Sequence, residues 1–341
     1  MAARRVLLTG GSGFVASQIL KILIAQGYSV RTTVRSQVRA NQVRDEYRDV
    51  SNDRLDFAIV EDLDVEGAFD DAVISDPPFE AVIHTASPFR FNVTDIQKEL
   101  IDPAVMGTIS ILKAVKKNAP TAKQVVMTSS FVAMVDPAKG HWPGHKYSEE
   151  DWNPTTLDEA LQNPISGYRG SKTFAEKAAW DFVRYEQPNF TLTTINPPLV
   201  FGPLAPNVTS LNGLNTSNEF FRDLILGKFQ DHLPPTIAHI WVDVRDLAQA
   251  HVRALEVSEA ANSRFFVAAG MFSNREIVRI IRSRMSEYSS RLPPESIEGG
   301  DYPQGGIYGI DNSRTQKILR VGFRSLEESV IDTVKSIEGL L

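Results

Sequence analysis

The sequence predicts an α/β fold in which a doubly wound parallel sheet is followed by a smaller C-terminal lobe, and three observations support this. Over residues 1–200, short apolar and β-branched runs alternate with amphipathic segments, the pattern of parallel strands joined by crossover helices. A glycine-rich turn directly follows the first run. After NPPLVFGP (196–203) the alternation gives way to sequence rich in Pro, Asn and Ser. We therefore expect a first domain, built on the sheet, over 1–200 and mainly the smaller lobe over 201–341, with some segments, at about 237–260, returning to the first domain.

Each expected element follows from its local pattern. The first helix should end at Gly27, which directly follows the last periodic residue and can cap the helix. The carboxyl ends of the strands should form one edge, where open α/β sheets bind ligands. The expected strands cover 4–9, 29–34, 55–60, 80–86, 123–129 and 190–196, and the expected helices lie near 14–26, 37–48, 64–74, 95–118 and 167–187.

Composition and charge exclude several classes of function. The formal net charge is −6 and no basic cluster is present, which argues against nucleic-acid binding. The chain contains no cysteine, so disulfides and thiolate chemistry are excluded. The first expected strand begins too early for a signal peptide, and no apolar run is long enough to span a bilayer. We expect a cytoplasmic protein that is not bound to a membrane.

The turn between the first strand and the first helix has the pattern of a dinucleotide-binding site. In VLLTGGSGFVA (6–16), Gly10 can form the tight turn, Gly13 allows a pyrophosphate to approach the backbone, and Ala16 allows close packing of the helix on the strand. The helix N-terminus would then direct free N–H groups at the phosphates. A strand-to-helix turn without a ligand also favours glycine, so other motifs must decide.

The end of the second strand indicates which dinucleotide is bound. An acidic residue there would select NAD, but RTTVRSQVR has no acid before Asp45. Arg35 and Arg39 can instead pair with a 2′-phosphate, which favours NADP(H) over a merely solvated basic stretch. After the third strand, Asp62 and Leu63 could contact the adenine.

A tyrosine and a lysine that are four residues apart suggest carbonyl chemistry. Tyr168 and Lys172 lie on one face of an expected helix, and MTSS (127–130) ends a strand at the same crevice. Tyr168 could protonate a developing alkoxide, because the charge of Lys172 lowers the cost of forming phenolate. Ser130 could hold the carbonyl oxygen. Taken alone, the pair could equally be a contact on an amphipathic helix.

These motifs together resemble those of the extended short-chain dehydrogenases/reductases. The likeness rests on TGGSGFVA, HTASP, TSS, Tyr168-x-x-x-Lys172, NPPLVFGP and VDVRD, and it covers nearly the whole chain. HTASPFRFNVTD, EEDWNP and SKTFAEKAAWDF are similar to the fungal NADPH-dependent methylglyoxal and carbonyl reductases. Dihydroflavonol and cinnamoyl-CoA reductases resemble the chain more distantly.

The resemblance implies a Rossmann domain, a substrate-binding lobe and a catalytic triad of Ser130, Tyr168 and Lys172. Ser130 is preferred to Ser129 because the family's catalytic serine is the second serine of TSS. Lys172 should also hold the nicotinamide ribose. The cofactor-binding residues that the resemblance implies are Gly10, Gly13, Phe14, Val15, Arg35, Arg39, Asp62, Leu63, Thr85, Ala86, Ser87, Tyr168, Lys172, Pro197, Val200 and Ser217.

The substrate pocket is less clearly indicated. Its candidate apolar wall consists of residues that are each, taken singly, typical of core packing. Yeast relatives have an aromatic residue at the position of Leu199, which leaves the shape of the pocket open. The candidates are Phe89, Phe91, Phe131, Leu199 and Trp241.

We therefore expect an NADPH-dependent reductase of a small ketone or aldehyde, acting as a monomer or homodimer. The alternatives are a nucleotide-sugar epimerase or dehydratase on the same fold, and a catalytically silent NADP-binding regulator. His141 and His145 lack a third ligand, so no metal site is expected. VDVRD (242–246) is interpreted as a structural link between the two lobes.

Overall fold

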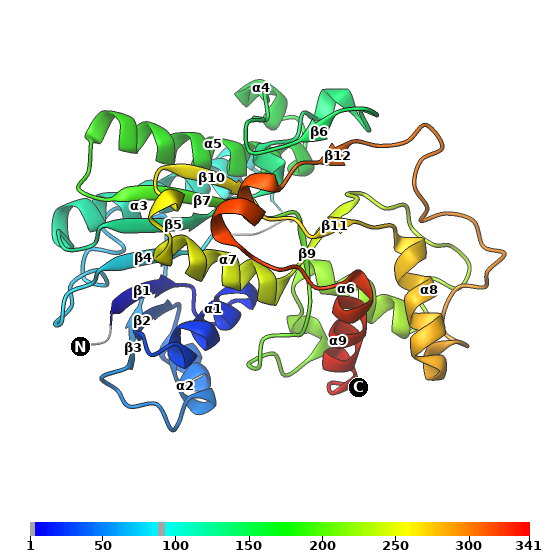
Figure 1. Ribbon diagram of the computed structural model, residues 1–341, viewed down its shortest axis with the longest axis horizontal. Helices are drawn as coiled ribbons and strands as arrows, with labels where there is room; N and C mark the ends of the chain where they lie inside the picture. Colours follow the sequence, from blue (N-terminus) through cyan, green and yellow to red (C-terminus); the bar gives the residue numbers. More distant parts are fainter. Residues whose placement is uncertain (1–3, 88–92) are drawn as a thin grey trace.

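The computed structural model describes residues 4–87 and 93–341, and its centre is a sheet of seven parallel strands (Figure 1). The strands are β1 (Arg5–Thr9), β2 (Ser29–Val34), β3 (Leu55–Ile59), β4 (Ala81–His84), β5 (Gln124–Thr128), β7 (Thr191–Asn196) and β10 (Ser263–Phe266). Their order is β10-β7-β5-β4-β1-β2-β3. The order reverses direction between β1 and β4, the position at which such sheets bind ligands.

The predicted α/β class and the first six strands are confirmed, and the expected bounds differ from the observed ones by at most two residues at either end. The seventh strand, β10, is not predicted from the sequence. It is only four residues long and pairs with β7 from Ser263 to Phe266. It is separated from β7 by the α6, β9 and α7 segments, so no βα repeat in the sequence announces it.

Helices cover both faces of the sheet (Figure 1). One face packs against α1 (Phe14–Ala25), α2 (Gln37–Glu46) and α7 (Val244–Glu256). The other packs against α3 (Asp102–Asn118), which continues from a π-helical turn (Gln97–Ile101), and α5 (Pro164–Glu186). In α1 the buried residues Ala16, Ile19, Leu20 and Leu23 follow helical spacing, which explains why this segment forms an amphipathic helix.

The helix expected near 64–74 is wrong, because this segment consists of bends and turns. Gly67 lies in its middle with φ of +77°. That left-handed conformation interrupts an α-helix and is open mainly to glycine. Phe69 and Val73 are nevertheless fully buried, so the apolar periodicity reflects packing onto the core rather than a helix.

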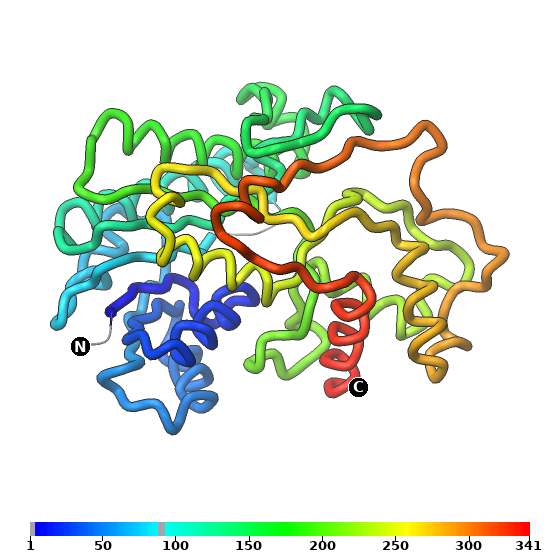
Figure 2. The backbone as a smooth tube through the Cα atoms, in the orientation of Figure 1, coloured from blue at the N-terminus to red at the C-terminus, as the bar shows by residue number. Residues whose placement is uncertain are grey.

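The C-terminal half builds two small sheets beside the main one. Strands β8 (Leu199–Phe201), β9 (Ile240–Asp243) and β11 (Gly270–Met271) form the first. Around it lie α6 (Thr216–Ile225), α8 (Asn274–Arg284) and α9 (Leu326–Glu338), which share a third apolar core. Figure 2 shows the chain crossing back over the molecule after α8, where β12 (Gly309–Ile310) pairs with β6 (Lys146–Tyr147).

The VDVRD segment connects α7 to the C-terminal helix, as expected of a structural link. Arg245 forms ion pairs with Asp243 at 2.8 Å and with Asp332 on α9 at 2.7 Å. Asp246 pairs with Arg324, just before α9.

Among residues 4–87 and 93–341, none of the helices is long and apolar enough to span a bilayer. The division of the chain near residue 200 into two units stays a prediction.

Candidate active site

The glycine-rich turn between β1 and α1 has no room for side chains on the side where β4 ends. Gly10 has φ of +77°, and a Cβ there would lie 3.3 Å from the Cα of Ala86. At Gly13 a Cβ would lie 3.1 Å from the Gly10 carbonyl oxygen. Gly13 caps α1 without a side-chain hydrogen bond, so first-turn N–H groups stay available to an anion. The turn therefore fits a pyrophosphate.

Gly11, which the sequence analysis does not single out, is the most tightly packed glycine of this turn. A Cβ at Gly11 would lie 2.0 Å from the Oγ1 atom of Thr32 on β2. The Gly11 N–H also donates to the Thr33 carbonyl at 3.0 Å. Only glycine allows this close approach of the turn to β2. The doubled glycine in TGGSG was the sequence signal for this requirement.

Hydrogen bonds tie the ends of β1 and β4 together beneath the turn. The Oγ1 atom of Thr9 accepts from the backbone N–H groups of Thr85 and Ala86, each at 3.1 Å, and lies 2.9 Å from Nδ1 of His84. Burial and the nearby charge of Lys172 lower the His84 pKa to about 4, so the ring is neutral at pH 7. The HTA segment is thus fixed against the glycine turn.

The predicted 2′-phosphate residues follow β2 directly. Arg35 is exposed, and among the residues that the structure describes it has no acidic partner. Arg39 lies in the first turn of α2 and hydrogen bonds Gln42 at 3.1 Å. Asp62 is exposed and Leu63 is largely buried just beyond β3. The Arg35 guanidinium, placed directly after β2, therefore fits a phosphate better than a ribose hydroxyl.

Helix α5 places Tyr168 and Lys172 beside the end of β5. The Lys172 ammonium lies 5.9 Å from the centre of the Tyr168 ring. Its Nζ donates to the Ser87 hydroxyl at 2.6 Å. The side chain of Ser130, at the start of the 3₁₀ turn after β5, lies close enough to the Tyr168 hydroxyl to lower its pKa. The three residues of the predicted triad are therefore neighbours in the structure.

Burial sets the protonation of this group. It raises the pKa of Tyr168 above its usual value, and the neighbouring Ser130 hydroxyl only partly offsets this. It lowers the pKa of Lys172 to about 8, because a charged amine loses hydration there. At pH 7 the phenol therefore keeps its proton, while most of Lys172 remains charged. Such a pair can donate a proton from oxygen and stabilise the resulting anion.

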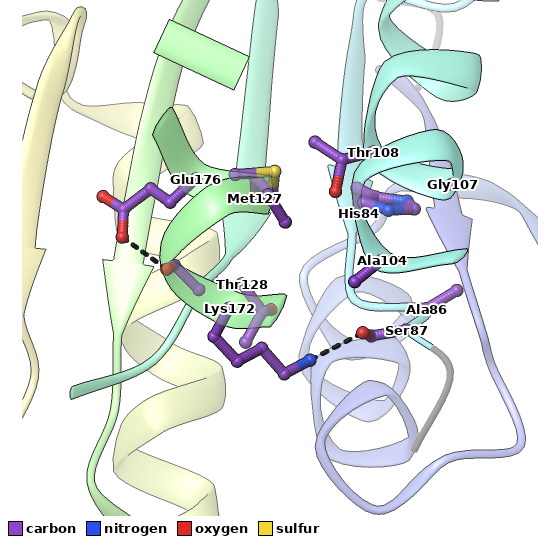
Figure 3. A pocket seen from close by; sticks show the side chains of 12 residues that line it. His84, Ala86, Ser87, Ala104, Gly107, Thr108, Met127, Thr128, Lys172 and Glu176 are labelled. Atoms are coloured by element: carbon purple, nitrogen blue, oxygen red, sulfur yellow. Dashed lines mark hydrogen bonds between the residues drawn. The ribbon is translucent and has the colours of Figure 1, made fainter. Parts of the chain in front are cut away.

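The structure separates the roles of the two serines in TSS. The Ser129 hydroxyl donates to the buried carboxylate of Glu176 at 2.5 Å, so it is directed away from Tyr168. A narrow cavity of about 20 Å³ lies between Lys172 and Glu176 on one side and Ser87, His84 and Thr108 on the other (Figure 3). Glu176 was missed from the sequence, although it follows Lys172 by one helical turn.

Comparison with known proteins supplies the family. Residues 6–269 match the NAD dependent epimerase/dehydratase family. The chain belongs to this family. It is 45% identical to ketoreductase azaE of Aspergillus niger over 338 residues, covering 98% of both chains. It is also similar to the crystal structure of Candida albicans Gre2 in complex with NADPH, at 35% identity and a TM-score of 0.89 over 99% of both chains.

A second solved relative is yeast methylglyoxal/isovaleraldehyde reductase Gre2 complexed with NADPH. It is 32% identical, with a TM-score of 0.89 over 99% of this chain and 100% of the relative. The predicted membership of the extended short-chain dehydrogenases/reductases and the predicted Rossmann fold are thereby confirmed. The predictions of an oxidoreductase and of NADP(H) agree with what these relatives are named for and bind.

In this extended short-chain dehydrogenase/reductase, the remaining predicted cofactor residues follow β7. The Pro197 carbonyl accepts from the Phe131 N–H at 2.8 Å, which fixes the loop after β7 next to Ser130. Val200 lies on β8, paired with Val242. Ser217 lies in the first turn of α6 and is half-buried. Their contacts with a nicotinamide stay predictions.

Two of the predicted substrate residues pack in cores. Phe131 is buried and stacks on Phe266 with ring centres 5.3 Å apart. Trp241 is buried beside Phe201. Leu199, which pairs with Trp241 across β8 and β9, is more exposed. Phe89 and Phe91 lie outside the described residues. The composition of the substrate wall stays a prediction.

The two loop histidines have ordinary structural contacts. His145 stacks on Trp142 with ring centres 3.8 Å apart, and its Nε2 lies 3.1 Å from Asp151. His141 lies edge-on to His239. In the part of the chain that the structure describes, no group of three or more His, Cys, Asp or Glu side chains could hold a metal ion.

Replacing Gly11 tests the glycine turn. Gly11→Ala places a methyl group against Thr32, so either the turn or β2 must shift. We expect NADPH affinity to fall by about 10-fold or more, since each 1.4 kcal/mol of distortion at the phosphate site costs a factor of ten. Fluorescence titration of NADPH measures this. Gly322→Ala, where a Cβ meets nothing within 4 Å, is the control, and equal affinities for both variants would contradict the account.

Proposed function

We propose that this protein is an NADPH-dependent carbonyl reductase that converts a small ketone or aldehyde to an alcohol. The observation that carries the proposal is the convergence of Ser130, Tyr168 and Lys172 at the carboxyl end of β5, described above. Two of the similar proteins are named as reductases of methylglyoxal or as ketoreductases, which supports the reaction class. The specific substrate within this class is set by the pocket.

In the proposed reaction, Tyr168 is the general acid. Its phenol donates a proton to the carbonyl oxygen as negative charge develops there. The Lys172 ammonium stabilises the phenolate that remains, because opposite charges at this distance favour the ionised form. The Ser130 hydroxyl donates a hydrogen bond to the same oxygen and orients the carbonyl. In the reverse direction Tyr168 acts as base and removes the proton from the alcohol.

The residues that would hold NADPH lie around the strand ends. Backbone N–H groups of Phe14 and Val15 would bind the pyrophosphate, and Arg35 and Arg39 the 2′-phosphate. Lys172 would bind the ribose. When bound, NADPH supplies the hydride, and the protein contributes orientation, charge and the proton.

Carbonyl reduction is favoured over the alternatives on two grounds. The first ground concerns the nucleotide-sugar epimerase or dehydratase. Arg35 has no acidic partner among the described residues, which suits an NADPH that is taken up and released in each turnover. A silent regulator would be expected to lack Tyr168 or Lys172, and both are present and adjacent.

We also propose that the protein is cytoplasmic and works as a monomer or homodimer without a metal.

Removing the phenol tests the general acid. Tyr168→Phe keeps the ring but removes the only group proposed to donate the proton, so kcat should fall by about 10²-fold or more. NADPH affinity should stay within about 2-fold, because the ring and Lys172 remain. Steady-state NADPH oxidation and fluorescence titration give the two values. Tyr185→Phe, at an exposed tyrosine, is the matched control. Retention of most activity in Tyr168→Phe would rule out this assignment.

Charge reversal at β2 tests the cofactor choice. Arg35→Asp replaces a phosphate partner with a group that repels phosphate and accepts from ribose hydroxyls. The ratio of kcat/KM for NADPH to that for NADH should drop by about 10- to 100-fold, which is the worth of one charged hydrogen bond. Arg48→Asp, at an exposed arginine just after α2, controls for general charge. An unchanged ratio would remove Arg35 from the site.

The pKa of Lys172 predicts a pH dependence. Because that pKa is lowered to about 8, the amine is charged below this pH and becomes neutral above it. The stabilisation of phenolate is then lost, so kcat/KM for NADPH, which reports the free enzyme, should fall as pH rises through about 8. Tyr168 does not titrate there because its pKa is raised. A flat profile between about pH 6 and about pH 10 would contradict this role.

A further inference from the structure

Glu176 is a fully buried carboxylate that the proposed reaction does not use. Its side chain has no exposed surface and forms an ion pair with Arg264 on β10 at 2.7 Å. On α5 it follows Lys172 by four residues and Tyr168 by eight, so the three side chains share one face. A charge is rarely buried this deeply unless every oxygen has partners. The identity of those partners shows what the carboxylate does.

One oxygen of Glu176 is bound to residues of α5, β7 and β10. Oε1 accepts from Nε of Arg264 at 2.7 Å, from the Thr194 hydroxyl at 3.0 Å and from the Trp180 indole at 3.3 Å. The Arg264 guanidinium also stacks on Trp152, 3.7 Å from the ring centre. These contacts anchor α5 to β7, to β10 and to the loop that contains Trp152.

The other oxygen is bound to the residues that surround Ser130. Oε2 accepts from the Ser129 hydroxyl at 2.5 Å, from Nδ2 of Asn196 at 2.7 Å and, at the longer distance of 3.5 Å, from Nη2 of Arg264. The same Nδ2 donates to the Ser130 carbonyl at 3.2 Å. Within the described residues, the buried Oδ1 of Asn196 has no hydrogen-bond partner. The orientation of this amide therefore depends on its nitrogen, and so on Glu176.

We propose that Glu176 is a positioning residue that holds Ser130 opposite Tyr168. It fixes the side chain before Ser130 directly and the Ser130 carbonyl through Asn196. Because Glu176 lies on the same helix as Tyr168, it sets the distance between the serine and the tyrosine. The inference rests on the proposed function, since it assigns Glu176 to the triad that carries it.

The chemistry of the contacts explains why a carboxylate is required. Both oxygens of Glu176 face only donors, and a carboxylate can accept from all of them. An amide cannot, because its NH₂ group would face at least two donors whichever way it turned. If the NH₂ faced Ser129 and Asn196, the Asn196 amide would have to turn and release the Ser130 carbonyl.

The test combines Glu176→Gln with Ser130→Ala, singly and together. Glu176→Gln alone should lower kcat by about 10²-fold, the cost of a misplacement near 1 Å. NADPH affinity should change by less than about 2-fold. In the Ser130→Ala background, Glu176→Gln should lower kcat by less than about 2-fold, because nothing remains to be positioned. A purely structural role would not give this dependence on Ser130.

Two further variants keep the test decisive. Asn196→Ala leaves the Glu176–Arg264 pair intact and removes the amide that links Glu176 to the Ser130 carbonyl, so it should reproduce the kcat loss if Glu176→Gln fails to fold. Trp180→Phe removes a bond to the other oxygen and should leave kcat unchanged. If Glu176→Gln lowers kcat by the same factor with and without Ser130→Ala, this inference is overturned while the proposed function stands. A wild-type protein without carbonyl turnover, or a fully active Ser130→Ala, contradicts the proposed function and the inference with it.

Discussion

The position of α5 against the ends of β5, β7 and β10 is the constraint on which the candidate site depends. The buried pair of Glu176 and Arg264 fixes it, since its hydrogen bonds reach all of these elements. A buried pair of this kind contributes little net stability compared with an apolar replacement, yet losing one partner is costly. Its value here lies in specifying one arrangement, in which Ser130 lies opposite Tyr168.

Burial then sets the protonation state of each group at this crevice. The same loss of hydration keeps the Tyr168 phenol protonated, brings the Lys172 pKa to about 8 and leaves His84 neutral. The glycine turn complements these side chains, because its backbone N–H groups can bind an anion without any charged side chain. Positive charge thus lies at Arg35 after β2 and at Lys172, with the uncharged backbone of the glycine turn between them.

Local patterns in the sequence predicted most of the fold and the proposed triad. The strands and the α5 spacing depend on short-range periodicity, which can be read from neighbouring residues. The expected helix near 64–74 failed because the conformation of Gly67 is decided by the surrounding chain. Glu176 was missed because its partner, Arg264, is 88 residues away. For the same reason, the packing of Phe131 and Trp241 in cores depends on tertiary contacts that no local pattern shows.

The account's central claim is that this protein delivers hydride from NADPH to a carbonyl carbon. The most direct measurement incubates the purified protein with NADPH deuterated at the transferable position and with aldehydes, diketones and aryl ketones, and locates the deuterium by NMR. The account predicts an alcohol that carries one deuterium on the carbinol carbon, formed faster with NADPH than with NADH. Binding of NADPH without deuterium transfer to any of these carbonyls would contradict it.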